Sequence, residues 1–113
     1  MATTYNLAID QGTDFTYTIT VVDATKTVRD LTGYTGKAQL RRSYASTSNT
    51  EFTINIAAPT SGNVVITLSN AKTANLKYGR YLYDVELTKT ADSTIERIQE
   101  GIAVIYPQVT RTD

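Results

Sequence analysis

The sequence predicts an all-β protein, an antiparallel β-sandwich of about seven strands with one short helix near residues 70–77. Apolar and polar residues alternate along most of the chain, which is the pattern of strands that are buried on one face. The longest such region, residues 79–106, reads GRYLYDVELTKTADSTIERIQEGIAVIY and consists of two arms around a polar turn. Strand-favouring residues are also abundant, since threonine is the commonest residue and tyrosine occurs 8 times.

The first half of the chain provides the first predicted strands. Residues 4–10 and 14–22 alternate on either side of a Gly-containing turn. A third strand is predicted over residues 34–43 and a fourth over residues 51–56, with a polar loop between them. The residues expected to share one face of their strand are Tyr5, Leu7 and Ile9, then Phe15, Tyr17, Ile19 and Val21, and then Phe52, Ile54 and Ile56, whereas Ala38 and Leu40 should face inward. The core expected between the sheets comprises Phe15, Ile19, Ile54, Ile66, Tyr83, Val85, Ile102 and Val104.

The second half begins with a hairpin and the helix. A fifth strand over residues 63–68 should pair with the fourth strand across a Pro-Thr-Ser-Gly turn. The helix that follows can take Ser69 or Asn70 as its N-cap. Gly79 lies where this helix would end.

The two arms of the long hairpin complete the predicted sandwich. We expect a bulge near Gly101, because glycine inside a strand often marks one. The residues predicted to share one face of each arm are Tyr81, Tyr83, Val85 and Leu87, and then Ile98, Ile102, Val104 and Tyr106. If Val85 and Ile102 are buried between the sheets, truncating either to Ala should cost about 2–4 kcal/mol.

The short helix and the strand that follows it point to a particular kind of sandwich. In immunoglobulin-like domains a tyrosine near the start of strand F lies two residues before a core cysteine. Tyr81 and Tyr83 have this spacing, with Tyr83 in the place of the cysteine. We therefore expect an immunoglobulin-like sandwich. No repeat or domain boundary is visible, so residues 1–113 should form a single domain.

Composition argues against several classes of function. The 11 basic residues equal the 11 acidic residues, and this balance is unusual for a general nucleic-acid binder. Without cysteine or histidine there is no disulfide, no thiolate zinc site and no Ser-His-Asp triad. No apolar run approaches the roughly 20 residues of a membrane span, and the N-terminus does not resemble a signal peptide. We expect no enzyme, no cofactor, no nucleic acid and no membrane.

Two pairs of acidic residues are candidate chemical sites. Asp10 and Asp14 flank a turn and could bind calcium. We favour the interpretation that both are ordinary carboxylates of a strand end and a turn. Asp84 and Glu86 lie on one strand face and could act as acid and base on a sugar. We favour solvated charges on the outer face of the sheet.

Contacts with other proteins are a stronger prediction than catalysis. Arginine and tyrosine dominate interface hot spots, and strand edges and chain ends can add to a neighbour's sheet. We also expect the termini to be ordered by neighbouring subunits rather than by their own domain. The residues predicted to bind partners are Tyr5, Arg41, Arg42, Tyr44, Gln108, Thr110 and Arg111.

Several stretches resemble a known family in their order and spacing. They are YNLAIDQGTDF (5–15), DLTGYTGKAQLR (30–41), LSNAKTANLKYGRYLYDVEL (68–87) and EGIAVIYPQVTR (100–111). They resemble small β-sandwich structural proteins of tailed bacteriophages, and in particular the N-terminal domain of baseplate upper proteins. The resemblance implies a virion component of the tail, baseplate or fibre-attachment region, which is made in the host cytoplasm and acts by interaction.

Two other functions stay open. A capsid decoration or neck protein belongs to the same broad class and differs in its place in the virion. A carbohydrate-binding module for host attachment belongs to another class, because small sandwiches with exposed tyrosines bind sugars. For the favoured function we expect other virion proteins as partners, homo-oligomers within a symmetric assembly and, as a less favoured partner, a host glycan.

Overall fold

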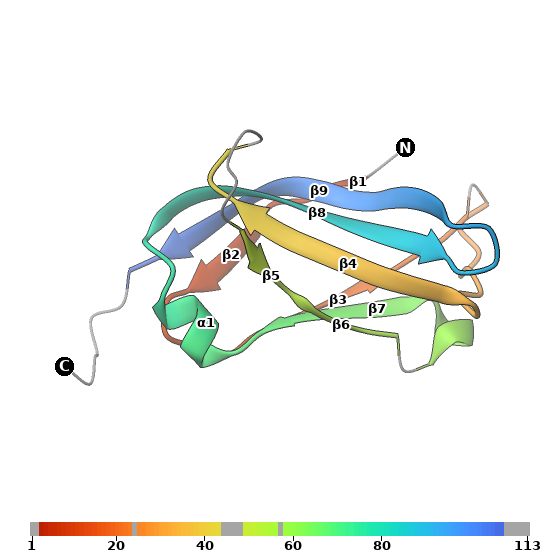
Figure 1. Ribbon diagram of the computed structural model, residues 1–113, viewed down its shortest axis with the longest axis horizontal. Coiled ribbons are helices and arrows are strands. Elements are labelled where there is room, and N and C mark those ends of the chain that lie inside the picture. The colour runs from red at the N-terminus through yellow and green to blue at the C-terminus, as the bar shows by residue number, and fades with distance from the viewer. Residues whose placement is uncertain (1–2, 24, 44–48, 57, 108–113) are drawn as a thin grey trace.

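Two packed β-sheets make up the domain (Figure 1). The computed structural model describes residues 3–23, 25–43, 49–56 and 58–107. The larger sheet contains β1 (Thr3–Thr4), β2 (Leu7–Asp10), β4 (Tyr34–Arg41), β5 (Thr50–Glu51), β8 (Gly79–Lys89) and β9 (Thr94–Tyr106). The smaller sheet contains β3 (Phe15–Thr20), β6 (Thr53–Asn55) and β7 (Asn63–Leu68). The predicted all-β sandwich is confirmed.

The strand order is that of an immunoglobulin-like sandwich. The order β9-β8-β4-β5 in one sheet and β3-β7-β6 in the other corresponds to strands G-F-C-C′ and B-E-D. One departure from the expected antiparallel pattern is at the N-terminus, where β1 and β2 run parallel to β9. Constant-type immunoglobulin domains place their first strand beside strand B. Here the N-terminal strands lie in the other sheet, so β3 has no such neighbour among the described strands.

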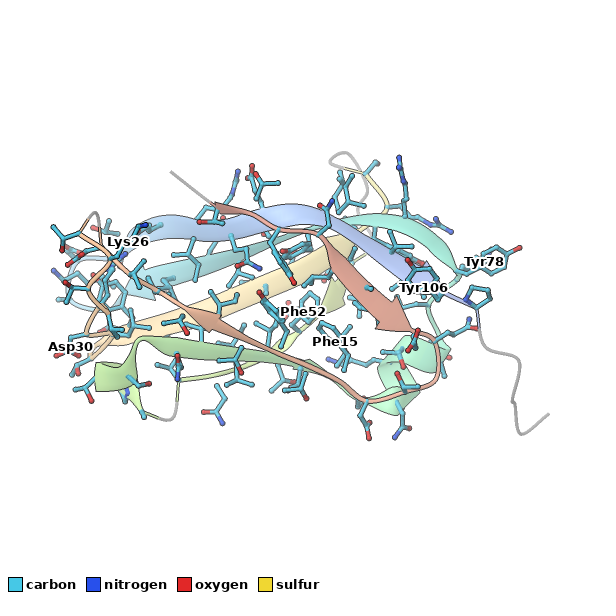
Figure 2. All side chains as sticks on the ribbon, turned by 180° about the vertical axis from the view of Figure 1, so that it is seen from behind. Phe15, Lys26, Asp30, Phe52, Tyr78 and Tyr106 are labelled. Carbon is cyan, nitrogen blue, oxygen red and sulfur yellow. The ribbon has the colours of Figure 1, made fainter. Side chains whose placement is uncertain are left out.

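A tyrosine corner, as the sequence suggested, precedes the core of β8. The Tyr81 hydroxyl donates a 2.9 Å hydrogen bond to the carbonyl of Lys77, four residues upstream. Tyr83 follows at the position of the core cysteine and is only 4% exposed. Its ring contacts Phe52 edge-on, and Phe52 in turn contacts Phe15. Figure 2 shows both phenylalanines between the sheets.

The second arm of the long hairpin has the opposite phase to the one predicted. Ala103 and Ile105 are the buried residues, whereas Ile102 and Val104 are half-buried on the outer face. The bulge lies between Gln99 and Arg97, opposite Val85 and Glu86, and not at Gly101. Because residues 102–105 form one continuous apolar run, alternation alone could not decide which pair faced inward. The predicted burial of Ile102 is therefore wrong, so the large cost expected for a buried side chain does not apply to it, whereas Val85 is fully buried as predicted.

The helix is shorter than predicted. The structure has α1 (Asn70–Ala74), whose N-cap Ser69 accepts a hydrogen bond from the amide of Lys72. Asn75 is the C-cap, and Gly79 begins β8 instead of ending the helix. A short 3-10 turn, η1 (Pro59–Ser61), joins β6 to β7. Neither of these helices is long and apolar enough to cross a membrane.

Two predicted strands are each divided in the structure. The segment 50–55 changes sheets at Phe52, whose amide bonds the carbonyl of Ala38. Beyond this crossing Ile54 packs so close to β4 that a Cβ on Gly36 would lie 2.5 Å from it. The first strand is interrupted between β1 and β2. Thr3 and Thr4 pair with β9 of their own domain, so the expectation that neighbouring subunits rather than the domain itself order the N-terminus is wrong for these described residues.

Candidate partner-binding surface

The two ends of the elongated sandwich differ in the residues that they expose (Figures 1 and 2). At one end, which we call the helix end, lie α1, the start of β8 and the end of β9. At the other, the hairpin end, lie the turn between β8 and β9 and the described residues of the loop after β3, 21–23 and 25–33. Figure 2 shows Tyr78 and Tyr106 at the helix end and Lys26 and Asp30 at the hairpin end.

Arg42 is held in place at the helix end. Its guanidinium carbon lies 4.6 Å from the centre of the Tyr81 ring, a cation–π contact. One of its nitrogens donates a 3.3 Å hydrogen bond to the carbonyl of Arg80. Gly79 makes room for it, since a Cβ there would lie 2.9 Å from Nη1. Within the described part of the chain, the ion pairs involve Arg29 and Arg97, and Arg42 has no carboxylate partner.

A hollow of about 580 Å³ opens beside this arginine. Tyr78 in its wall is 65% exposed, and Tyr106 nearby is 50% exposed. The Gln11 side chain forms part of the wall and donates a 2.8 Å hydrogen bond to the carbonyl of Leu76. The residues that line the hollow are Gln11, Arg42, Lys77, Tyr78 and Pro107. This end hollow therefore offers aromatic surface next to two cations.

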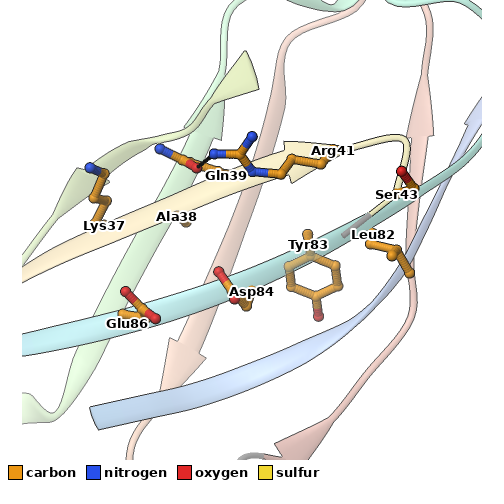
Figure 3. A pocket seen from close by; sticks show the side chains of 9 residues that line it. All are labelled: Lys37, Ala38, Gln39, Arg41, Ser43, Leu82, Tyr83, Asp84 and Glu86. Atoms are coloured by element: carbon orange, nitrogen blue, oxygen red, sulfur yellow. Dashed lines mark hydrogen bonds between the residues drawn. The ribbon is translucent and has the colours of Figure 1, made fainter. Parts of the chain in front are cut away.

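The other predicted arginine, Arg41, lies on the outer face of the larger sheet (Figure 3). It lines a hollow of about 380 Å³ and donates a 2.9 Å hydrogen bond to Gln39 Oε1. Since Arg42 instead contacts Tyr81, the two arginines do not act as one clamp. The structure separates the pair because neighbouring residues at a strand end point to different sides.

Asp84 and Glu86 lie in the same outer-face hollow. The Asp84 carboxylate lies 3.4 Å from Arg97 Nε, and its side chain is 39% exposed. Glu86 is opposite Lys37 on β4 and opposite Arg97 on β9. Opposite charges thus alternate over this face, which agrees with the favoured interpretation of solvated outer-face carboxylates.

Asp14 is used to hold the helix. Its Oδ1 accepts a 2.8 Å bond from the amide of Asn70 and a 3.0 Å bond from the Asn70 side chain. The backbone carbonyl of Asp10 accepts hydrogen bonds from the hydroxyl and the amide of Thr13 at the turn. No group of three or more possible metal ligands occurs among residues that the structure describes. The turn interpretation therefore accounts for the observed contacts of both residues.

Tyr5 lies at the break between β1 and β2, where it is tied to its own domain. Its ring stacks on Tyr17 with centroids 5.2 Å apart, and it is 47% exposed. Its carbonyl accepts a hydrogen bond from the Tyr83 hydroxyl, which also accepts one from Gln99. A Cβ on Gly101 would overlap this carbonyl. Burial raises the pKa of Tyr83 to about 12, so this hydroxyl stays protonated as a donor.

The remaining predicted partner residues, Tyr44, Gln108, Thr110 and Arg111, lie outside the described residues. Sequence reasoning missed Lys77, Tyr78 and Pro107 as surface residues. A signal was present for Tyr78, because it stands between the predicted helix and the alternating strand and belongs to neither pattern, whereas Lys77 was placed at the end of the predicted helix. Large polar and aromatic residues at such a junction have no place in the core.

The chain is similar to a known protein in structure but matches none in sequence. No protein-family model matches the chain, and no curated protein matches it. Among solved structures, it is similar to NK cell receptor Nkp44, described as a triggering partner in natural cytotoxicity, with a TM-score of 0.48 and 12% identity. The match covers 94% of this chain and 99% of that chain. The strand order and the tyrosine corner assign the chain to the immunoglobulin-like sandwiches.

Proposed function

We propose that this chain is a structural subunit of a tailed-phage particle, in the tail, baseplate or fibre-attachment region. It acts through contacts with other virion proteins and with copies of itself, and not through catalysis. The sequence resemblance described above supports this assignment. The observation that carries the contact function is the helix end, where Arg42 lies against the Tyr81 ring, has no carboxylate partner among the described residues and lies beside exposed tyrosines.

The chemistry of the end hollow favours an acidic protein segment as its occupant. Arg42 is fixed by the Tyr81 ring, so binding a carboxylate costs little additional side-chain ordering. Lys77 adds a second positive charge at the wall. Tyr78 supplies rigid aromatic area that a partner can cover. Aromatic residues and arginine are the types that most often anchor protein interfaces.

Incorporation into particles tests this proposal. Particles would be assembled with the natural chain, with Arg42→Ala, with Tyr78→Ala, or with Lys89→Ala, which removes a charge at the hairpin end. We expect Arg42→Ala and Tyr78→Ala to lower the incorporated amount about tenfold, as for a hot-spot residue. Lys89→Ala should incorporate normally. Equal incorporation of all four chains would contradict the role of the helix end, and absence of the natural chain from purified particles would contradict the virion assignment.

The place in the particle is a separate question. A tail or baseplate subunit should remain with tails when heads and tails are separated. A capsid decoration protein should instead remain with tail-less heads, and a neck protein should be found at the junction. Detection of the chain in each fraction distinguishes these versions of the structural function.

A carbohydrate-binding module for host attachment is the second candidate. The specific observation in its favour is the exposure of Tyr78 and Tyr106 beside the end hollow, since aromatic faces with a polar rim suit sugar rings. Titration of the isolated domain with host surface polysaccharide tests it. Saturable binding that Tyr78→Ala abolishes and Lys89→Ala preserves would favour this function. No binding to the polysaccharide would exclude it.

A further inference from the structure

The edge of the smaller sheet at β3 is unpaired along its whole length among the described residues. β3 pairs with β7 on one side, and the described strands include no neighbour on the other. The amide of Val21 bonds the carbonyl of Gly62 in the same register as the β3–β7 ladder. Antiparallel hydrogen bonding alternates, so the odd-numbered residues of β3 bond β7. The backbone groups of Thr16, Thr18 and Thr20 therefore point away from the sheet.

This edge lacks the devices that usually prevent strand addition. Proteins protect exposed edges with charges, proline, bulges or very short strands. The six residues of β3, FTYTIT, include no charge, no proline and no glycine. Their threonine side chains are exposed on the outer face. The edge also corresponds to the side on which a constant-type immunoglobulin domain adds its first strand. The edge is thus suited to accept an extended strand.

We infer that β3 pairs with β3 of a second copy of this chain, antiparallel about a two-fold axis at Thr18. In this register Thr16 faces Thr20 of the partner subunit and Thr18 faces Thr18 of the partner subunit. All these residues have outward backbone groups, so the pairing makes about six hydrogen bonds. The two small sheets become one continuous sheet with both inward faces on the same side.

The side chains match in the same register. On the inner face Tyr17 lies opposite Ile19 of the partner subunit, an aromatic and β-branched pair that favours strand pairing. On the outer face threonine meets threonine, which is also favourable. β3 contains no charged residue that would repel a second β3. The chain as a whole has no net charge to keep copies apart. These features favour a second copy over a charged extended segment.

Disulfide trapping tests the inference, because the chain contains no cysteine. A hydrogen-bonded antiparallel pair has Cα atoms roughly 5.5 Å apart, within the range that a disulfide can bridge. We expect Thr18→Cys to form a cross-linked dimer under mild oxidation. Thr53→Cys, on β6 at the opposite edge of the same sheet, should stay monomeric. Thr16→Cys and Thr20→Cys should cross-link to each other when mixed, and much less to themselves.

A second measurement does not depend on a covalent bond. One strand edge is small beside a standard interface of roughly 1,600 Å², so the isolated dimer should dissociate on dilution. The amide signals of Thr16, Thr18 and Thr20 should then shift with concentration in the natural chain. They should not shift in Thr18→Lys, which places like charges opposite each other at the axis.

Two results would overturn the inference. One is a Thr18→Cys chain that folds but cross-links no more than Thr53→Cys. The other is preferred self-cross-linking of Thr16→Cys, which would require another register. These experiments use the isolated chain, so failure of the virion assignment would leave their outcome unaffected.

Discussion

An arginine lies against a tyrosine ring near each end of the sandwich, but the two arginines differ in their partners. At the hairpin end Arg29 lies 5.7 Å from the Tyr34 ring centre and binds both carboxylate oxygens of Glu96, at 3.0 and 2.8 Å. At the helix end Arg42 lies 4.6 Å from the Tyr81 ring centre and binds only a backbone carbonyl among the described residues.

The two ends therefore differ in whether the arginine has a carboxylate partner within the described part of the domain. The Arg29–Glu96 pair joins the loop after β3 to β9, and hydrogen bonding to Glu96 raises the pKa of Arg29. Its charge is satisfied within the domain. Arg42 is also oriented by a tyrosine ring, but no carboxylate of the described residues pairs with its charge. The same local motif therefore serves stability at one end and, as proposed, recognition at the other.

The largest expected effect comes from removing the ring beneath Arg42. Tyr81 is 8% exposed, and Tyr81→Ala should lower the free energy of unfolding by about 3–5 kcal/mol. Tyr34 is only half-buried, so Tyr34→Ala should cost clearly less. Urea denaturation of both variants measures this difference. Equal losses in the free energy of unfolding would show that the two rings stabilise the fold to the same extent, and would contradict the expected difference between the ends.

Neutralising Glu96 should make the hairpin end resemble the helix end. Glu96→Gln removes the charge that pairs with Arg29, and we expect a loss of about 0.5–1 kcal/mol, because the pair is partly exposed. The loss should shrink when the measurement is repeated at high salt. Particle incorporation should not change. A loss of incorporation as large as that of Arg42→Ala would show that the hairpin end also takes part in partner contacts.

Removing Arg42 should affect binding far more than folding. An exposed cation–π contact contributes about 0.5–1 kcal/mol, so Arg42→Ala should unfold close to the natural chain in urea. Arg42→Lys keeps the charge but not the planar guanidinium and is the matched control. Partial incorporation of Arg42→Lys would support carboxylate recognition. A large loss of stability in Arg42→Ala would instead show that this arginine serves the fold.

The smallest effect should be a local opening of the hairpin end in acid. Hydrogen bonds from threonine hydroxyls and from backbone amides lower the pKa of Asp23, Asp30 and Asp92 below the usual value. Stabilisation from a lowered carboxyl pKa is present above the unfolded value of about 3.8 and is lost as the pH falls through the folded value. Amide exchange in the turns that these residues hold should therefore rise below about pH 4.

Exchange at the helix end provides the internal control for this acid effect. At that end the Ser69 hydroxyl, which does not titrate in acid, accepts the hydrogen bond from the amide of Lys72 at the start of α1. If all regions of the domain exchanged faster together, the opening would be global unfolding and not a property of the hairpin end.

Local patterns were sufficient for much of the fold. Alternation located the strand segments, and the Tyr81-x-Tyr83 spacing predicted the corner that the structure contains. Ser69 was among the predicted N-caps and is the one used. For the surface, the sequence pointed to Arg42 but paired it with Arg41, because adjacency along the chain was the only available measure of nearness. The end hollow could not be predicted, because residues that are far apart in the sequence, such as Lys77 and Pro107, line it together.

The sequence by itself determined which segments become strands, because alternation of apolar and polar residues is a local property that burial imposes on one face. Tertiary structure decided which face of residues 102–105 is inside, since both phases of that run are apolar and only pairing with β8 selects Ala103 and Ile105. It also decided that β1 and β2 join β9 and not β3. That choice depends on hydrogen bonds between residues far apart in the chain, and it leaves the β3 edge unpaired among the described residues.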